Sequence, residues 1–209
     1  MRVLLIGSSG LVGQIVLTSV LADPRFTEVV ALTRASLPPH PKLLNPIADF
    51  RDLPLDAAWW SVDGVICTLG TTLRKAGSES AFREVDHDFP LAVARAAFAK
   101  GTRRFALNSA LGADAASRFF YNRVKGETER DLAAIGFTSL AFVRPGLIDG
   151  SRAEFRLGER AGLLVSRIVS GVLPARLRPS RADRIAAELV KAIAEPKPGI
   201  RIVSSAELA

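Results

Sequence analysis

The chain has 209 residues, of which 48% are hydrophobic and 23% charged, and its mean hydropathy is +0.22. This balance excludes a disordered or collagen-like chain, and no run reaches the roughly 18 apolar residues of a membrane-spanning helix. The net charge is +7. No low-complexity linker divides the sequence, so we expect one domain over residues 1–209.

The predicted elements alternate between strands and helices along the chain. Apolar runs predict strands at Arg2–Ile6, Glu28–Leu32, Gly64–Thr68, Arg103–Asn108, Thr138–Val143 and Ile200–Val203. Amphipathic segments predict helices at Leu11–Ala22, Ser80–Ala99, Ala115–Ile135, Ala161–Ser170 and Arg181–Ala194. Continuously apolar strands between helices are typical of an α/β protein with a doubly wound parallel sheet covered on both faces.

A glycine-rich turn joins the first predicted strand to the first predicted helix. Its spacing is G-x-x-G-x-x-G, and it supplies our candidate pyrophosphate-binding residues Gly7, Ser9, Gly10, Leu11, Val12 and Gly13. Glycines permit a tight turn and close approach of backbone N–H groups to a phosphate, and the helix N-terminus favours an anion. The alternative is a tight turn without a ligand, but the order strand, loop, helix favours dinucleotide binding.

Two positions follow the glycine loop where a dinucleotide-binding chain contacts adenosine. The second strand ends at Thr33-Arg34, where an acidic residue would hold the ribose of NAD. An arginine pairs instead with a 2′-phosphate, so we predict NADP(H) in preference to NAD(H), although a solvent-facing Arg34 is the alternative. Further on, Asp49-Phe50 supplies a carboxylate and a ring that could contact adenine.

Three residues in the second half form a candidate catalytic site. Tyr121 and Lys125 are four residues apart, hence on one helical face, and Ser109 ends the preceding strand. A lysine cation beside a phenol favours the phenolate, which lets tyrosine donate or accept a proton near neutral pH. In isolation, a tyrosine and a lysine four residues apart usually lie on the exposed surface of a helix. After a phosphate loop it predicts a reductase in which Tyr121 protonates a carbonyl, Ser109 orients it and Lys125 also holds the nicotinamide ribose.

The chain resembles the short-chain dehydrogenase/reductase superfamily, and within it the atypical subgroup of Tat-interacting-protein-like oxidoreductases. The most specific matching segments are Cys67–Thr72, Lys75–Gly77, Gly112–Asp114, Tyr121–Glu127 and Arg144–Gly146. The resemblance implies a Rossmann-like domain in which residues 146–209 form a small substrate-side addition, with NADPH as cofactor. It implies further cofactor contacts from Leu69, Gly70 and Thr71, from Asp49 and Phe50 around the adenine, and from Pro145 near the nicotinamide.

Three departures from the subgroup weaken particular expectations. Ala110 stands where a second serine is frequent, and Ala35 follows Arg34 where a second basic residue occurs. No asparagine lies between Ser80 and Ala99, so a proton relay through that residue type is not supported.

Other reactive residue types are assigned structural roles. Cys67 is expected to be a small core residue, and His87 between two aspartates is not expected to bind a metal, because neighbours in sequence point to different helical faces. Trp59 and Trp60 are expected to pack. Arg152 and Arg156 either bind an anionic substrate or form ion pairs within a lid.

The excess of basic residues bears on possible binding partners, and the single cysteine on the cellular compartment. Arginines concentrate in one C-terminal stretch, at positions 152, 156, 160, 167, 176, 178, 181 and 184. A basic groove for a cofactor or substrate explains them as well as nucleic acid does, and no nucleic-acid-binding motif accompanies them. One cysteine fits a reducing compartment, and we predict the cytoplasm rather than a cleaved N-terminal signal.

The leading prediction is an NADPH-binding oxidoreductase that reduces a carbonyl compound, as a monomer or homodimer, without a metal or a membrane partner. A protein that senses NADP(H) without chemistry is the first alternative. A sugar-nucleotide epimerase or dehydratase is the second, although about 60 residues after Pro145 are few for the substrate domain of such an enzyme.

Overall fold

The computed structural model describes residues 1–149 and 179–208. The strands are β1 (Arg2–Ile6), β2 (Glu28–Leu32), β3 (Leu43–Leu44), β4 (Gly64–Cys67), β5 (Arg104–Asn108), β6 (Ser139–Val143), β7 (Ile148–Asp149), β8 (Ser180–Arg181) and β9 (Gly199–Val203). The helices are α1 (Leu11–Ala22), α2 (Leu73–Ala76), α3 (Glu79–Arg83), α4 (Phe89–Ala99), α5 (Phe120–Ala133) and α7 (Ala182–Ala194). Short helical turns are η1 (Ala58–Trp60), the π-helical η2 (Glu84–Asp88) and η4 (Ser205–Leu208).

Seven of these strands form one parallel sheet, in the order β3-β2-β1-β4-β5-β6-β9. The central strands β1, β4 and β6 are mostly apolar and almost entirely buried, because both of their faces are covered, as parallel sheets require. The order reverses at β1, whose neighbours are β2 and β4, and ligands bind in the crevice at such a switch point. The doubly wound α/β class predicted from the sequence is therefore confirmed.

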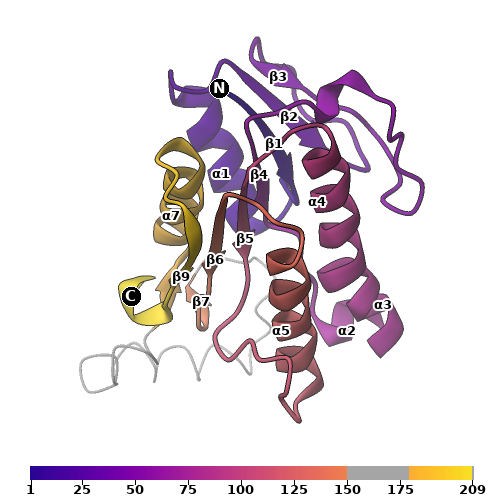
Figure 1. Cartoon of the computed structure of the whole chain (residues 1–209), viewed down its shortest axis with the longest axis vertical. Coiled ribbons are helices and arrows are strands. Elements are labelled where there is room, and N and C mark those ends of the chain that lie inside the picture. Colours follow the sequence, from indigo (N-terminus) through magenta and orange to yellow (C-terminus); the bar gives the residue numbers. More distant parts are fainter. Residues whose placement is uncertain (150–178, 209) are drawn as a thin grey trace.

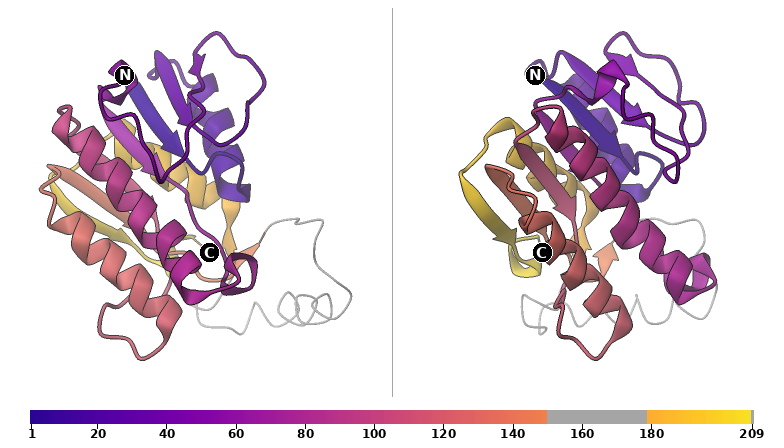
Figure 2. Two further views of the ribbon diagram at one scale, coloured as in Figure 1. Left: turned by 90° about the vertical axis from the view of Figure 1, so that its right-hand side faces the viewer. Right: turned by 45° about the vertical axis from the view of Figure 1, so that its right-hand side comes forward.

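Helices cover the two faces of the sheet in pairs. Helices α1 and α7 pack together on one face, and α4 and α5 lie on the other (Figure 1). Figure 2 shows α4 and α5 running side by side in both views. Val16 of α1 and Leu189 of α7 belong to one buried cluster, and Val93 of α4 and Leu132 of α5 belong to the other. Strand β9 pairs with β6, so the C-terminal part of the chain extends the main sheet.

The helical segment predicted over Ser80–Ala99 is present, but a π-helical turn, η2, divides it into α3 and α4. The N–H of Phe89 donates to the carbonyl of Glu84, five residues back. Pro90 has no N–H to reach the carbonyl of Asp86, which accepts the hydroxyl of Thr128 at 3.0 Å instead. This bulge re-aims the side chains of η2, and the site depends on that direction.

The helix predicted from Ala115 begins five residues later, at Phe120. A Cβ on Gly126 of α5 would lie 2.1 Å from the backbone nitrogen of Ala115, so this segment runs across the helix and cannot belong to it. Side-chain turns hold the segment, since Asp114 Oδ1 accepts the N–H of Ala116 at 2.9 Å.

The remaining elements differ from prediction in smaller ways. The two-residue strands β3, β7 and β8 are too short for a periodicity to reveal. The predicted helix Ala161–Ser170 and the candidate substrate residues Arg152 and Arg156 lie outside the described residues. Across the described ranges, no helix is both long and apolar enough to cross a membrane.

Candidate cofactor and catalytic site

The glycine loop is shaped by contacts that leave no room for side chains. Gly7 has a φ of +87°, and a Cβ there would lie 2.5 Å from the backbone nitrogen of Leu69. A Cβ on Gly13 would lie 2.1 Å from the carbonyl oxygen of Gly7. Gly10 caps α1 without a side-chain hydrogen bond, and the first turn of α1 holds no acidic residue. The positive end of α1 is thus open to an anion, which fits a pyrophosphate.

We expect Gly13→Ala to destabilise the protein by at least about 2 kcal/mol and to abolish nucleotide binding, because the new methyl group forces the loop away from α1. Urea unfolding and an NADPH titration measure the two effects. Gly10→Ala is the matched control for stability, since its Cβ would lie at an ordinary 3.5 Å from the same oxygen. Its free energy of unfolding should stay within about 1 kcal/mol of the wild type. Equal stability losses in both variants would contradict the steric explanation.

Three residues predicted at the adenosine end, Arg34, Asp49 and Phe50, line one cavity of about 420 Å³, and Thr33 is not among its lining residues. Its lining comprises Arg34, Ile47, Ala48, Asp49, Phe50, Arg51, Glu84, Val85 and Phe89. The ring of Phe50 stacks on that of Phe89, with centroids 5.4 Å apart. Arg34 forms no ion pair with any residue in the described ranges, whereas Thr33 is buried and its hydroxyl donates to the carbonyl of Ala35. Arg51 and Glu84 were not predicted from the sequence.

A second cavity, of about 260 Å³, lies beyond the carboxyl ends of β5 and β6. It is lined by Ser109, Ala110, Leu111, Tyr121, Pro145, Gly146, Leu147 and Ile148. The ring of Tyr121 packs against that of Phe82, 5.5 Å away, and 37% of the residue is exposed. Ser109, Tyr121 and Pro145 thus line one cavity, whereas Lys125, the third predicted catalytic residue, is not among its lining residues.

Lys125 is buried and forms an ion pair that the sequence did not predict. Its ammonium lies 2.7 Å from Oδ1 of Asp86, whose side chain is fully buried in η2. The other carboxylate oxygen of Asp86 accepts the N–H of Thr71 at 2.8 Å. A Cβ on Gly70 would lie 3.4 Å from Asp86 Oδ1, so the loop after β4 packs on the pair. Residues 70 and 71 therefore contact Lys125 of α5 through Asp86.

The charge of Lys125 is maintained by this partner. Burial by itself lowers the pKa of the lysine ammonium, but the nearby carboxylate of Asp86 more than offsets burial, and the pKa is raised. Lys125 thus stays protonated at neutral pH four residues from Tyr121. The sequence signal for Asp86 is the acidic pair around His87, a pattern that by itself suggests only metal ligation.

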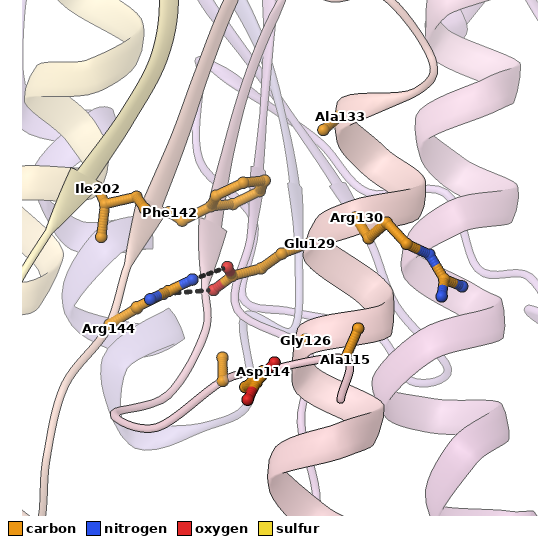
Figure 3. A pocket seen from close by; sticks show the side chains of 10 residues that line it. Asp114, Ala115, Gly126, Glu129, Arg130, Ala133, Phe142, Arg144 and Ile202 are labelled. Atoms are coloured by element: carbon orange, nitrogen blue, oxygen red, sulfur yellow. Dashed lines mark hydrogen bonds and ion pairs between the residues drawn. The ribbon is translucent and has the colours of Figure 1, made fainter. Parts of the chain in front are cut away.

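The hydroxyl of Ser109 is engaged by a second buried carboxylate. Ser109 Oγ donates to Oε1 of Glu129 at 2.5 Å, and Arg144 holds Glu129 through two nitrogens, with Nε 3.0 Å from Oε1. Figure 3 shows the ion pair of Glu129, on α5, with Arg144, which follows β6; both residues line a cavity of about 300 Å³. Because a hydroxyl has one proton, Ser109 faces any further ligand as an acceptor. Glu129 lies four residues after Lys125, a spacing that could have indicated a shared helical face.

The residues to which the sequence assigns structural roles are buried, or contact neighbouring side chains of the fold. Burial raises the pKa of the Cys67 thiol to about 12, so this group is an inert core residue. The ring nitrogens of His87 lie within 3.0 Å of carboxylates of Asp88 and Asp131, which occupy both positions. Within residues 1–149 and 179–208, no group of three or more potential ligands gathers to hold a metal ion. Trp59 and Trp60 pack together, with ring centroids 4.2 Å apart.

Strand order, glycine loop and helix α1 define the class of protein: an NAD(P)-binding, Rossmann-like fold of the short-chain dehydrogenase/reductase type. No family model matches the chain. Among curated proteins it is similar to fmp52 of Emericella nidulans, with 37% identity over 82% of this chain and 76% of the relative. FMP52 of Eremothecium gossypii is 33% identical over 100% and 96% of the two chains. HTATIP2 of Rattus norvegicus is 37% identical over 75% of this chain and 66% of the relative.

The chain therefore belongs to the family of FMP52 and HTATIP2, an atypical branch of the short-chain dehydrogenase/reductase superfamily. Solved structures agree on the fold. MoeE5 in complex with UDP-glucose and NAD gives a TM-score of 0.72 at 16% identity, over 97% of this chain and 75% of that chain. UDP-glucose 4-epimerase from Thermotoga maritima gives a TM-score of 0.70 at 13% identity, over 99% of this chain and 77% of that chain. At such identities the likeness shows the fold alone.

The comparisons correct the expected compartment. The fungal relatives are named mitochondrial proteins, which overturns the prediction of a cytoplasmic location. That prediction rested on the lone thiol of Cys67, and a lone thiol favours reducing compartments in general. It cannot distinguish one reducing compartment from another.

Proposed function

We propose that the protein is an NADP(H)-dependent oxidoreductase that reduces a carbonyl group with Tyr121, Lys125 and Ser109. One observation carries this proposal: Tyr121 lines a cavity with Ser109, and four residues further along α5 lies the buried Lys125, whose charge is held by Asp86. A protonated lysine close to a phenol stabilises the phenolate that remains after proton donation. Arg34 at the adenosine cavity supports NADP(H) over NAD(H).

Each residue has a role that its surroundings support. The N–H groups at the start of α1 and in the glycine loop would hold the pyrophosphate. The nicotinamide, when bound, supplies the hydride. Tyr121 gives its phenol proton to the carbonyl oxygen, and Lys125 stabilises the resulting phenolate and binds the nicotinamide ribose. Ser109, whose hydroxyl donates to Glu129, lines the same cavity and would orient the alcohol that forms by accepting a hydrogen bond from its new hydroxyl group.

A non-catalytic NADP(H)-binding protein is the second candidate, and Ser109 favours it. With its proton engaged by Glu129 and with Ala110 as its neighbour, Ser109 offers no donor to a carbonyl oxygen. A substrate would then receive a hydrogen bond from Tyr121 alone.

Nucleotide titration followed by a turnover screen tests the proposal. We expect NADPH to bind at least tenfold more tightly than NADH, and aldehydes, ketones or quinones to stimulate NADPH oxidation. Calorimetry measures binding, and absorbance of the reduced nicotinamide measures turnover. Tight NADPH binding without turnover of any carbonyl would support the second candidate. No binding of either nucleotide would contradict both.

A further inference from the structure

A second arginine lies at the adenosine cavity, 17 positions beyond the one predicted from the sequence. Arg51 and Arg34 both line this cavity, which also contains the stacked rings of Phe50 and Phe89. The sequence places Ala35 after Arg34, so no second basic residue follows β2 directly. The fold brings a second guanidinium to the cavity from the turn that follows β3.

Arg51 is held in place by its own turn and by a carboxylate. Its backbone N–H donates to Oδ1 of Asp49 at 3.0 Å, which fixes the turn. Its guanidinium forms a two-point ion pair with Glu84, with Nε 2.6 Å from Oε1 and Nη2 2.7 Å from Oε2. Glu84 begins the π-helical turn, whose bulge brings it to the cavity.

This ion pair is easily exchanged for another anion. The side chain of Arg51 is 66% exposed and that of Glu84 is 28% exposed. Exposed pairs of this kind contribute little to stability because water and salt screen them. A phosphate monoester carries more charge than a carboxylate and offers three acceptor oxygens to a guanidinium fork. It therefore competes well for Arg51.

We propose that Arg51 is a second 2′-phosphate-binding residue and that Glu84 is the competing carboxylate that limits the preference for NADP(H). This inference rests on the proposed nucleotide-binding function. In it, Arg34 and Arg51 contact the 2′-phosphate from two strand ends, and Glu84 partly neutralises Arg51 when the nucleotide lacks that phosphate. Glu84→Gln releases Arg51, and Arg51→Gln removes the second contact.

The test compares dissociation constants for NADPH and NADH in the full chain by calorimetry. Arg51→Gln should weaken NADPH binding about tenfold, which corresponds to about 1.4 kcal/mol, and should change NADH binding by less than twofold. Glu84→Gln should tighten NADPH binding several-fold and leave NADH binding unchanged. The dissociation constant of the fragment 2′,5′-ADP should change in each variant as that of NADPH does, because the fragment retains the 2′-phosphate. Arg95→Gln removes the same charge from the exposed side of α4, away from the cavity, and is the matched control.

The outcomes separate this inference from the proposed function. Wild-type protein that binds neither nucleotide overturns both. Wild-type protein that binds nucleotide while Arg51→Gln leaves the ratio of the two constants unchanged overturns this inference alone. A loss in Arg95→Gln equal to that in Arg51→Gln would also overturn it, because net charge would then explain the effect.

Discussion

Tyr121→Phe is expected to lower carbonyl-dependent NADPH oxidation at least 100-fold while NADPH affinity stays within about twofold of the wild type. A positioned acid or base contributes about 10²–10⁴-fold to such a reaction, and the variant removes only the phenol oxygen. The ring still packs against Phe82, and the lost hydroxyl makes no hydrogen bond to a described residue. Stability should therefore not change. Steady-state rates, an NADPH titration and thermal unfolding measure the three quantities.

The neighbouring ring of Phe119 supplies the control for this variant. Phe119 is 76% exposed and does not line the cavity of Ser109, Tyr121 and Pro145, which is the proposed reaction cavity. Phe119→Leu should therefore retain full turnover. If Tyr121→Phe keeps more than a tenth of the wild-type rate, Tyr121 is not the proton donor. The role of the reaction cavity would then have to be reconsidered, although the nucleotide site would be unaffected.

Lys125→Met is expected to destabilise the protein by about 3–5 kcal/mol, because it leaves the carboxylate of Asp86 buried without its cation. The N–H of Thr71 remains as one hydrogen-bond donor to Asp86, which compensates only in part. Urea unfolding followed by circular dichroism measures the loss. A matched control is Lys100→Met, since this exposed lysine lies at the end of α4 and should change stability by at most about 0.5 kcal/mol.

A double variant separates the buried charge from the lost side chain. Asp86→Asn combined with Lys125→Met removes both charges, and we expect it to recover most of the stability lost in Lys125→Met. A double variant no more stable than Lys125→Met alone would show that packing, and not an unpaired carboxylate, dominates this position. The measurement requires no cofactor, so it is independent of the proposed function.

The parts of the site that the sequence predicted are those encoded by neighbouring residues. The glycine spacing from Gly7 to Gly13 and the helical spacing of Tyr121 and Lys125 are local patterns, and the structure places each where the pattern required. The six predicted strands match the structure to within one residue at either end, because each is a mostly apolar run, and the central ones are buried on both faces.

The parts that were missed depend on contacts between distant segments. Asp86 meets Lys125 across 39 positions, and Arg51 meets Glu84 across 33. Both acidic residues, Asp86 and Glu84, lie in the π-helical turn, which occurs where Pro90 cannot donate a hydrogen bond. A periodicity of 3.6 residues cannot foresee such a bulge. Neither can it show that Glu129 accepts the hydrogen bond of the Ser109 hydroxyl.

The sequence by itself thus determined the class of fold, the phosphate loop and the Tyr121–Lys125 pair, because hydrophobic periodicity and glycine spacing act within short segments. Only the tertiary structure decided the electrostatics: which carboxylate holds Lys125, which one engages Ser109, and which arginines share the adenosine cavity. The physical reason is that charges interact through space. The order of strands in the sheet, and not distance along the chain, sets which of them meet.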